Sequence, residues 1–127
     1  MTGPELKPLV WVGSSKRDFT GFPDPVQDVF GYALYLAQSG GKHWAKPLKG
    51  FGGAGVLEVV EDHDGDTYRT VYTVRFDTAV YVLHAFQKKS TRGIATPRHE
   101  MEMIEDRLRW ARQIHAAAGG RPSKENP

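Results

Sequence analysis

The sequence predicts an α+β domain with the element order β-α-β-β-β-α. A short apolar run near the N-terminus, two segments with helical apolar spacing and three closely spaced β-like runs support this prediction. Strands joined by short turns pair antiparallel, so we expect a small antiparallel sheet packed on one face by helices. The chain of 127 residues suits a single core. We expect one domain over residues 1–118 and a flexible tail over residues 119–127.

Two segments carry the apolar spacing of helices. Asp24 and Pro25 are typical of a helix start, and apolar residues then recur at helical intervals. The glycine pair that begins at Gly40 favours the end of this helix. A second helix is predicted to open at Thr96 and Pro97. Its apolar stripe comprises Met101, Ile104, Leu108 and Ala111.

Four runs predict strands, and the last three follow one another as a meander. Asp64 and Gly65 are a strong two-residue hairpin signal between the second and third runs. Asp77 and Thr78 mark a weaker turn between the third and fourth runs. The runs are PLVWVG at 8–13, GVLEVVED at 55–62, DTYRTVYTVRF at 66–76 and AVYVLHAFQKK at 79–89.

The two turns predict the register of the sheet and the composition of its two faces. Side chains alternate between faces along a strand, and directly opposed neighbours lie about 5 Å apart at Cβ. One face is apolar and is expected to lie under the helices; it comprises Leu57, Val59, Tyr68, Tyr72, Val74, Phe76, Tyr81, Leu83 and Ala85. The other face is expected to be open and to hold a compact polar site. Its two cross-strand rows are Glu58, Val71 and His84, and beside them Val60, Arg69 and Phe86.

The overall composition is that of an ordinary globular protein. Hydrophobic residues make up 39% of the chain and charged residues 25%, with a formal net charge of +2. No apolar run approaches the ~18 residues that span a membrane, and the N-terminus lacks the apolar core of a signal peptide. The chain has no cysteine, which excludes disulfides and thiolate chemistry. We expect a cytoplasmic protein without a membrane partner.

Basic residues gather in two segments of the chain. If these segments meet in space, they form a surface for a nucleic acid; the alternative is an ordinary solvated surface. The first segment holds Lys42, Lys46 and Lys49, and the second holds Lys88, Lys89, Arg92 and Arg98.

Two motifs that resemble ligand-binding sites lie in the wrong structural context for that role. Gly50, Gly52 and Gly55 have the spacing G-x-G-x-x-G, but the dinucleotide fingerprint opens a helix, whereas here a strand follows. The segment DHDGD places Gly65 too early for a calcium loop, so a hairpin tip is the better interpretation. The histidines lack the spacing of metal ligands. We expect neither a metal nor a cofactor.

The polar face offers residues for catalysis and for RNA binding. His84 is either a partly buried structural histidine or a general acid or base, because imidazole titrates near neutral pH. Arg69, Lys88 and Lys89 are either a solvated fringe or a grip on a phosphodiester group. Phe86, in the same row as Arg69, is suited to stack on a base.

Residues 46–90 resemble the phage-derived HigB-type branch of the RelE/ParE toxin superfamily. The shared traits are a K-x-L-x-G loop before the strand with Glu58, a Y-R-x-x-Y motif from Tyr68 to Tyr72, and L-H-x-F-x-K-K from Leu83 to Lys89. A T-P pair followed by a helix with acidic and arginine residues also fits, and the resemblance extends from about residue 9 to residue 114.

This resemblance implies a RelE-like fold and the toxin of a type II toxin–antitoxin pair. The partner it implies is a HigA-like helix-turn-helix antitoxin. Toxins of this kind usually cleave mRNA on the ribosome, whereas ParE relatives poison DNA gyrase without nuclease activity. A non-toxic module that only binds nucleic acid is a third interpretation.

The resemblance also suggests roles for individual residues. Arg69 matches an arginine on the middle strand of RelE-type toxins, and Lys88 and Lys89 match basic residues after the last strand. Some relatives carry lysines on the strand that here holds Glu58 between two apolar residues. A tyrosine that some relatives place in the C-terminal segment has no counterpart after Tyr81.

Our leading hypothesis is a metal-independent endoribonuclease, an mRNA interferase in which the RNA 2′-OH attacks the neighbouring phosphate. Arg69 and Lys88 are expected to hold the scissile phosphate. Glu58 or His84 is expected to take the 2′-OH proton, and His84 or a lysine to protonate the leaving 5′ oxygen. Contacts with the rest of the RNA are assigned to Lys46, Lys49, Phe86, Lys89 and Arg92.

Overall fold

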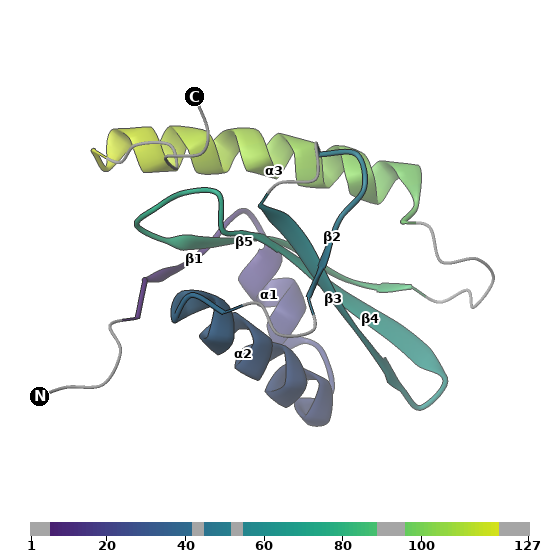
Figure 1. Cartoon of the computed structure of the whole chain (residues 1–127). Helices are drawn as coiled ribbons and strands as arrows, with labels where there is room; N and C mark the ends of the chain where they lie inside the picture. Colours follow the sequence, from purple (N-terminus) through teal and green to yellow (C-terminus); the bar gives the residue numbers. More distant parts are fainter. Residues whose placement is uncertain (1–5, 42–44, 52–54, 89–95, 120–127) are drawn as a thin grey trace, which may run out of the picture.

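One sheet flanked by helices forms the fold of this computed structural model, which describes residues 6–41, 45–51, 55–88 and 96–119. Within these residues, five strands lie in the order β1-β5-β4-β3-β2, and only the β1–β5 pair is parallel (Figure 1). The α+β class is confirmed, and a short helix and a short strand are added to the predicted order. The elements are β1 Leu9–Trp11, α1 Ser15–Thr20, α2 Asp24–Gln38, β2 Lys46–Pro47, β3 Val56–His63, β4 Asp66–Thr73, β5 Val80–Lys88 and α3 Arg98–Ala117.

The β3–β4 hairpin has the register that its turn predicts. Asp64 and Gly65 both have positive φ, 52° and 83°, as the two central residues of a tight hairpin turn require. Glu58 lies opposite Val71 in this hairpin, and all eight pairs follow the same register without a shift. The two-residue turn therefore sets the face on which every side chain of β3 lies.

A bulge interrupts the register between β4 and β5. Val71 lies opposite His84 as predicted, but Tyr72 lies opposite Val82, so Leu83 is an extra residue in β5. The prediction of one uniform register across this hairpin is therefore wrong beyond Val71. Because of the bulge, Tyr81 and Leu83 lie in the buried cluster of Val71, not in that of Leu57 and Ala85, so these two side chains are on the face opposite to the predicted one.

Helices cover both faces of the sheet, which corrects the expectation of helices on one face. Figure 1 shows α3 above the sheet and α1 and α2 below it. Phe30 of α2 belongs to a core cluster with Leu57 and Tyr72, whereas Ile104 of α3 belongs to a second cluster with Val71. The second face carries enough aliphatic surface to bury a helix, so the polar site predicted on it is largely covered.

The helix ends and the connection before β3 differ in detail from the prediction. α2 begins at Asp24, and Pro23 occupies the cap position that the sequence assigned to Asp24. Gly40, with φ of 98°, ends α2 as predicted. The sequence did not predict β2, in which Lys46 pairs with Glu58. The predicted flexible tail lies outside the described residues apart from Gly119.

The outer edge of β5 is only partly paired. β1 pairs with Val80, Tyr81 and Val82 and then ends, so no described strand lies beside the rest of β5. α1 takes this place, and the hydroxyl of buried Ser15 donates to the carbonyl oxygen of Val82 at 3.1 Å. The junction of β5, α1 and α3 is where the polar side chains gather. Among the described residues, no helix is long and apolar enough to cross a membrane.

Replacing Ile104 tests the packing of α3 on the sheet. Ile104 is fully buried, so Ile104→Ala should lower the free energy of unfolding by about 2–5 kcal/mol because a cavity remains. The neighbouring Met103 is 37% exposed, so Met103→Ala should change that free energy by no more than about 0.5 kcal/mol. Urea denaturation measures both, and equally small effects would show that α3 does not pack on this face.

Candidate active site

His84 lies at the β5 bulge and contacts two residues of α3. Its Nε2 is 2.5 Å from Oε1 of Glu100, and its Nδ1 is 3.2 Å from Nη1 of Arg107. A guanidinium group only donates hydrogen bonds, so Nδ1 must accept and carries no proton. The proton of the neutral ring therefore lies on Nε2 and is donated to Glu100. Both ring nitrogens are satisfied in this one tautomer.

Arg107 joins α3 to β5 and α1. Its Nη1 also donates to the carbonyl oxygen of Leu83 at 3.0 Å, and its Nη2 donates to Oγ of Ser14 at 2.9 Å. The Ser14 hydroxyl in turn donates to Oδ2 of Asp18 at 2.8 Å. Gly13, with φ of 60°, is required beside this group, because a Cβ there would lie 2.9 Å from Nε of Arg107. The result is a continuous chain of hydrogen bonds across three elements.

Burial and charge both act on the protonation of His84. Burial lowers its pKa, since the imidazolium form loses solvation, and the positive charge of Arg107 lowers it further. The hydrogen bond and negative charge of Glu100, and the charge of Asp18, oppose this shift without reversing it. Burial also lowers the pKa of Arg107. The neutral ring required by the hydrogen bonds is thus the form that the surroundings favour.

A second buried acid–base pair lies on the same face of the sheet. Nη1 of Arg69 donates to Oε2 of Glu58 at 3.0 Å, and their side chains are only 7% and 14% exposed. Arg69 lies opposite Phe86 across the β4–β5 pair, and the Phe86 ring stacks on His84 with centroids 4.9 Å apart. The ring of Phe86 therefore separates the Arg69–Glu58 pair from the His84–Glu100 pair.

The structure brings together part of the predicted set of residues. Glu58, Arg69, His84 and Phe86 lie within two neighbouring rows on one face, as predicted. Val71 lies between Glu58 and His84 in their row, and the hydrogen-bond partner of His84 is Glu100 of α3. Lys88 is the last residue of β5, two residues after Phe86. Lys46 of β2 is exposed and lies opposite Glu58 of β3. Lys49 is exposed after β2, and Lys89 and Arg92 lie outside the described residues.

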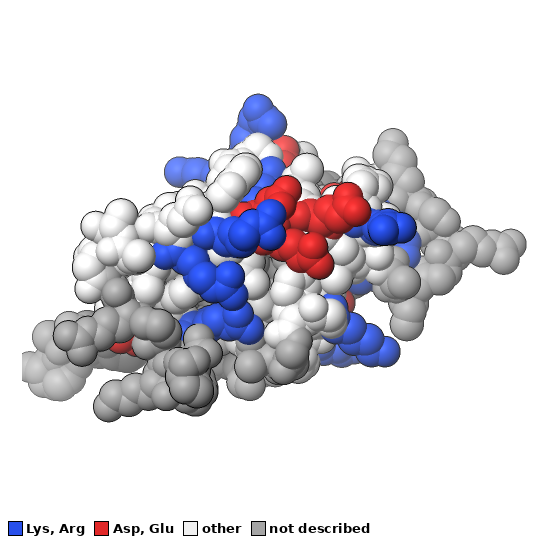
Figure 2. Space-filling view, turned by 90° about the horizontal axis from the view of Figure 1, so that it is seen from above, with Lys and Arg blue, Asp and Glu red and all other residues white. Residues whose placement is uncertain are grey.

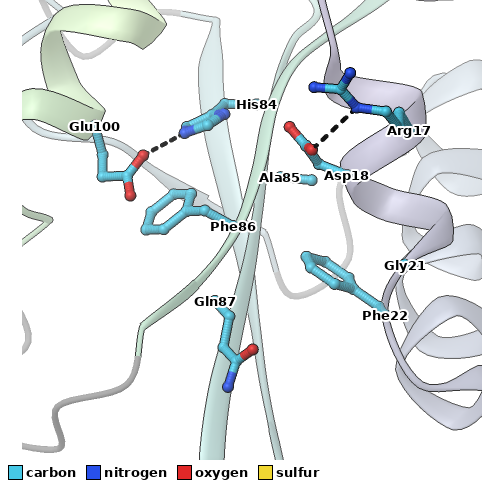
Figure 3. Close-up of a pocket in the computed structure, with 9 residues that line it drawn as sticks. All are labelled: Arg17, Asp18, Gly21, Phe22, His84, Ala85, Phe86, Gln87 and Glu100. Atoms are coloured by element: carbon cyan, nitrogen blue, oxygen red, sulfur yellow. Dashed lines mark hydrogen bonds and ion pairs between the residues drawn. The ribbon is translucent and has the colours of Figure 1, made fainter.

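A groove of about 440 Å³ opens beside His84, Phe86 and Glu100, at the part of the β5 edge where no described strand pairs. Glu100, His84 and Phe86 line it on one side of the strand, and Asp18 and Phe22 line it on the other (Figure 3). Gln87 and Arg17 complete a mixed polar and aromatic wall.

The charged surface above α3 is mixed in sign. Acidic side chains gather in the middle of this face, with basic side chains on both sides (Figure 2). Exposed acidic residues of α3 include Glu102, Glu105 and Asp106, and exposed basic residues include Arg109 and Arg112. The described residues on this side therefore do not form the continuous basic surface that two merged lysine-rich segments would give.

Sequence reasoning missed Glu100 and Arg107. Both lie on the buried face of α3 together with Ile104, Leu108 and Ala111. The signal was present in the sequence, because a glutamate and an arginine occupy positions of the apolar stripe at a spacing of seven residues. Charged groups at such positions need a partner from the surface they pack against.

Comparisons with known proteins identify the family. Residues 17–109 match the model of the phage-derived protein Gp49-like family (DUF891), so the chain belongs to that family. Among solved structures, a chain of the toxin–antitoxin complex RelBE2 from Mycobacterium tuberculosis is 19% identical, with a TM-score of 0.43 over 67% of this chain and 94% of that chain. No curated protein matches the chain in sequence.

The lowered pKa of His84 predicts an acid-dependent loss of stability. The folded protein binds a proton at His84 more weakly than the unfolded chain, so acidification below about pH 6.5 favours unfolding. His84→Gln should make the free energy of unfolding fall less steeply between pH 7 and 5 than in the wild-type protein. Denaturation with urea at several pH values measures this slope, and His63→Gln, at the end of β3 beside the hairpin turn, is the control. Identical slopes for the wild-type and His84→Gln proteins would contradict the assignment.

Proposed function

We propose that this member of the Gp49-like family is the toxin of a type II toxin–antitoxin pair and that it cleaves mRNA without a metal ion. The motifs of residues 46–90 support the assignment as a toxin through their resemblance to HigB-type sequences. The proposal for its chemistry rests on the arrangement of titratable side chains around Phe86.

The observation that supports RNA cleavage best is the presence of two buried acid–base pairs on one face. Phe86 lies opposite Arg69 of the Arg69–Glu58 pair and stacks on His84 of the His84–Glu100 pair. His84, Glu100 and Phe86 line an open groove. Buried ion pairs cost desolvation energy and add little stability relative to apolar packing. Groups of this kind that converge beside a cleft are typical of catalytic sites.

Two basic side chains, those of Lys88 and Arg69, supply positive charge to the proposed reaction centre. Lys88 lies on the same strand as Phe86 and is half-buried, so its ammonium group is suited to contact the scissile phosphate. Arg69 is buried against Glu58 and supplies a fixed positive charge behind Phe86. Phe86 is only 7% exposed, so we assign it to the floor of the site rather than to stacking on a base.

The proposed reaction is transesterification within the RNA. The 2′-OH loses its proton and attacks the neighbouring phosphorus, the bond to the 5′ oxygen breaks, and a 2′,3′-cyclic phosphate and a 5′-OH end result. Charge builds on the phosphate oxygens during this step, and fixed cations near them lower the barrier. The partners that we propose are mRNA, presented by the ribosome, and a helix-turn-helix antitoxin of the HigA type.

Replacing Lys88 tests this function directly. Lys88→Ala should reduce cleavage by about 10²–10³-fold, because one group that stabilises transition-state charge is lost. Primer extension on transcripts measures cleavage after induction in a bacterial host, and with purified ribosomes and purified protein. Growth of the host should recover in parallel with the loss of cleavage.

The matched control is Lys16→Ala, which removes an exposed lysine of α1 that does not line the groove. This variant should cleave mRNA and arrest growth like the wild-type protein. Growth arrest with intact transcripts and altered DNA supercoiling would refute the nuclease and favour a gyrase-inhibiting toxin. The absence of growth arrest without an antitoxin would favour a nucleic-acid-binding module.

A further inference from the structure

The proposed reaction needs a base for the 2′-OH proton, and the structure narrows the choice among the candidate groups. The lone pair of His84 is on Nδ1, where Arg107 already donates to it at 3.2 Å, and its Nε2 carries the proton donated to Glu100. His84 is also only 4% exposed. It has no basic atom directed toward a substrate while these hydrogen bonds are intact.

Glu58 is a poor candidate for the general base because its carboxylate is already paired with Arg69. Its Oε2 accepts a hydrogen bond from Arg69 at 3.0 Å, and removing the carboxylate charge by protonation would leave the guanidinium of Arg69 buried beside a neutral group. Lys46 of β2 lies opposite Glu58 and adds a second positive charge on the same face. The Glu58 carboxylate is thus already engaged with Arg69, and Glu58 does not line the groove.

Glu100 differs from Glu58 in its access to the groove, because Glu100 lines the groove and Glu58 does not, although their side chains are similarly exposed, at 17% and 14%. Oε1 accepts from His84, whereas Oε2 lies 3.3 Å from Nε2 of His99, a largely exposed residue. The carboxylate lines the groove at the edge of β5 together with Phe86, and Figure 3 shows it on the same side of the strand as that ring. A base needs this combination of fixed orientation and access to substrate.

We propose that Glu100 is the general base of this site and that Arg107 is a positioning residue, which holds His84 in the tautomer that orients Glu100. The proposal rests on the RNA cleavage proposed above. Oε2 of Glu100 takes the 2′-OH proton as the 2′ oxygen bonds to phosphorus. The bond to the 5′ oxygen breaks, and that oxygen takes a proton from the ammonium group of Lys88. Exchange with water then returns Glu100 and Lys88 to their starting forms.

The charged surroundings make the role of Arg107 testable through pH. His84 is faced by Glu100 and Arg107 of α3 and by Asp18 of α1; Arg17 of α1 and His99 of α3 lie next to these carboxylates. Without the Arg107 charge, His84 becomes protonated at a higher pH and binds Glu100 as an imidazolium ion. Glu100 is then a weaker base at a pH where the wild-type protein is still active.

The first experiment compares Glu100→Gln with Glu102→Gln in the full chain, with ribosomes and a defined mRNA. Glu100→Gln keeps an acceptor for His84 but removes the base, so kcat should fall by about 10²–10⁴-fold with little change in KM. Glu100→Asp keeps a carboxylate and should retain more activity than Glu100→Gln. Glu102 is exposed, two residues along the same helix, and its replacement should leave kcat unchanged. Circular dichroism melts of each variant verify that it is folded.

The second experiment compares Arg107→Met with Arg107→Lys in the pH dependence of kcat. Arg107→Met should move the acidic limb of the profile to higher pH, and Arg107→Lys should move it less because the charge remains. A residue that acted only through stability would lower activity at every pH without displacing this limb, and that result would overturn the positioning role of Arg107.

The outcomes separate the two proposals. If the wild-type protein does not cleave mRNA, the proposed function is wrong, and the role of Glu100 is wrong with it. If the wild-type protein cleaves and Glu100→Gln cleaves within about threefold of it at every pH, the function stands and Glu100 is not the base.

Discussion

The hydrogen bonds of the Arg107 guanidinium group hold together the three elements that form the site. β1 ends beside Val82, so the following residues of β5 have no strand on their outer side among the described residues. Arg107 reaches this edge from α3 and donates to Leu83, His84 and Ser14. A planar guanidinium group suits this place because it donates in several directions at once and stays charged. The position of α1, the tautomer of His84 and the orientation of Glu100 depend on these contacts.

The burial of charged side chains in this site costs solvation free energy. Arg69 and Arg107 are both buried, and burying a charge is unfavourable unless opposite charge and hydrogen bonds compensate for lost solvation. The compensation comes from Glu58 for Arg69 and from a chain of polar partners for Arg107. An apolar core of the same shape would avoid that cost. The catalytic role that we propose for this site accounts for polar groups in the space between the sheet and α3.

Local sequence signals predicted the parts of the fold that local chemistry determines. The Asp64-Gly65 turn fixed the β3–β4 register, and helical spacing located α2 and α3. The bulge at Leu83 could not be predicted in this way, because every residue from Val80 to Phe86 except His84 is apolar, so no alternation marks the extra residue. The covering of the second face depends on long-range packing of α3, which the spacing within one helix does not reveal.

The candidate site could likewise be predicted only in part from the sequence. The pairing of Arg69 with Phe86 and of Val71 with His84 followed from counting residues back from two turns. Glu100 and Arg107 escaped prediction because their partners come from β5 and α1, far away in the sequence. Charged residues within the apolar stripe of a helix were the available signal, and they pointed to a buried polar network without identifying its members.

The most direct test of this account is the tautomer of His84, observed by ¹⁵N nuclear magnetic resonance of the imidazole nitrogens. The account predicts a neutral ring at pH 7 with a proton on Nε2 and a bare, hydrogen-bonded Nδ1, and it predicts that Arg107→Met abolishes this preference. A ring protonated on Nδ1 at pH 7, or a spectrum unchanged by Arg107→Met, would contradict the claim that Arg107 organises the site.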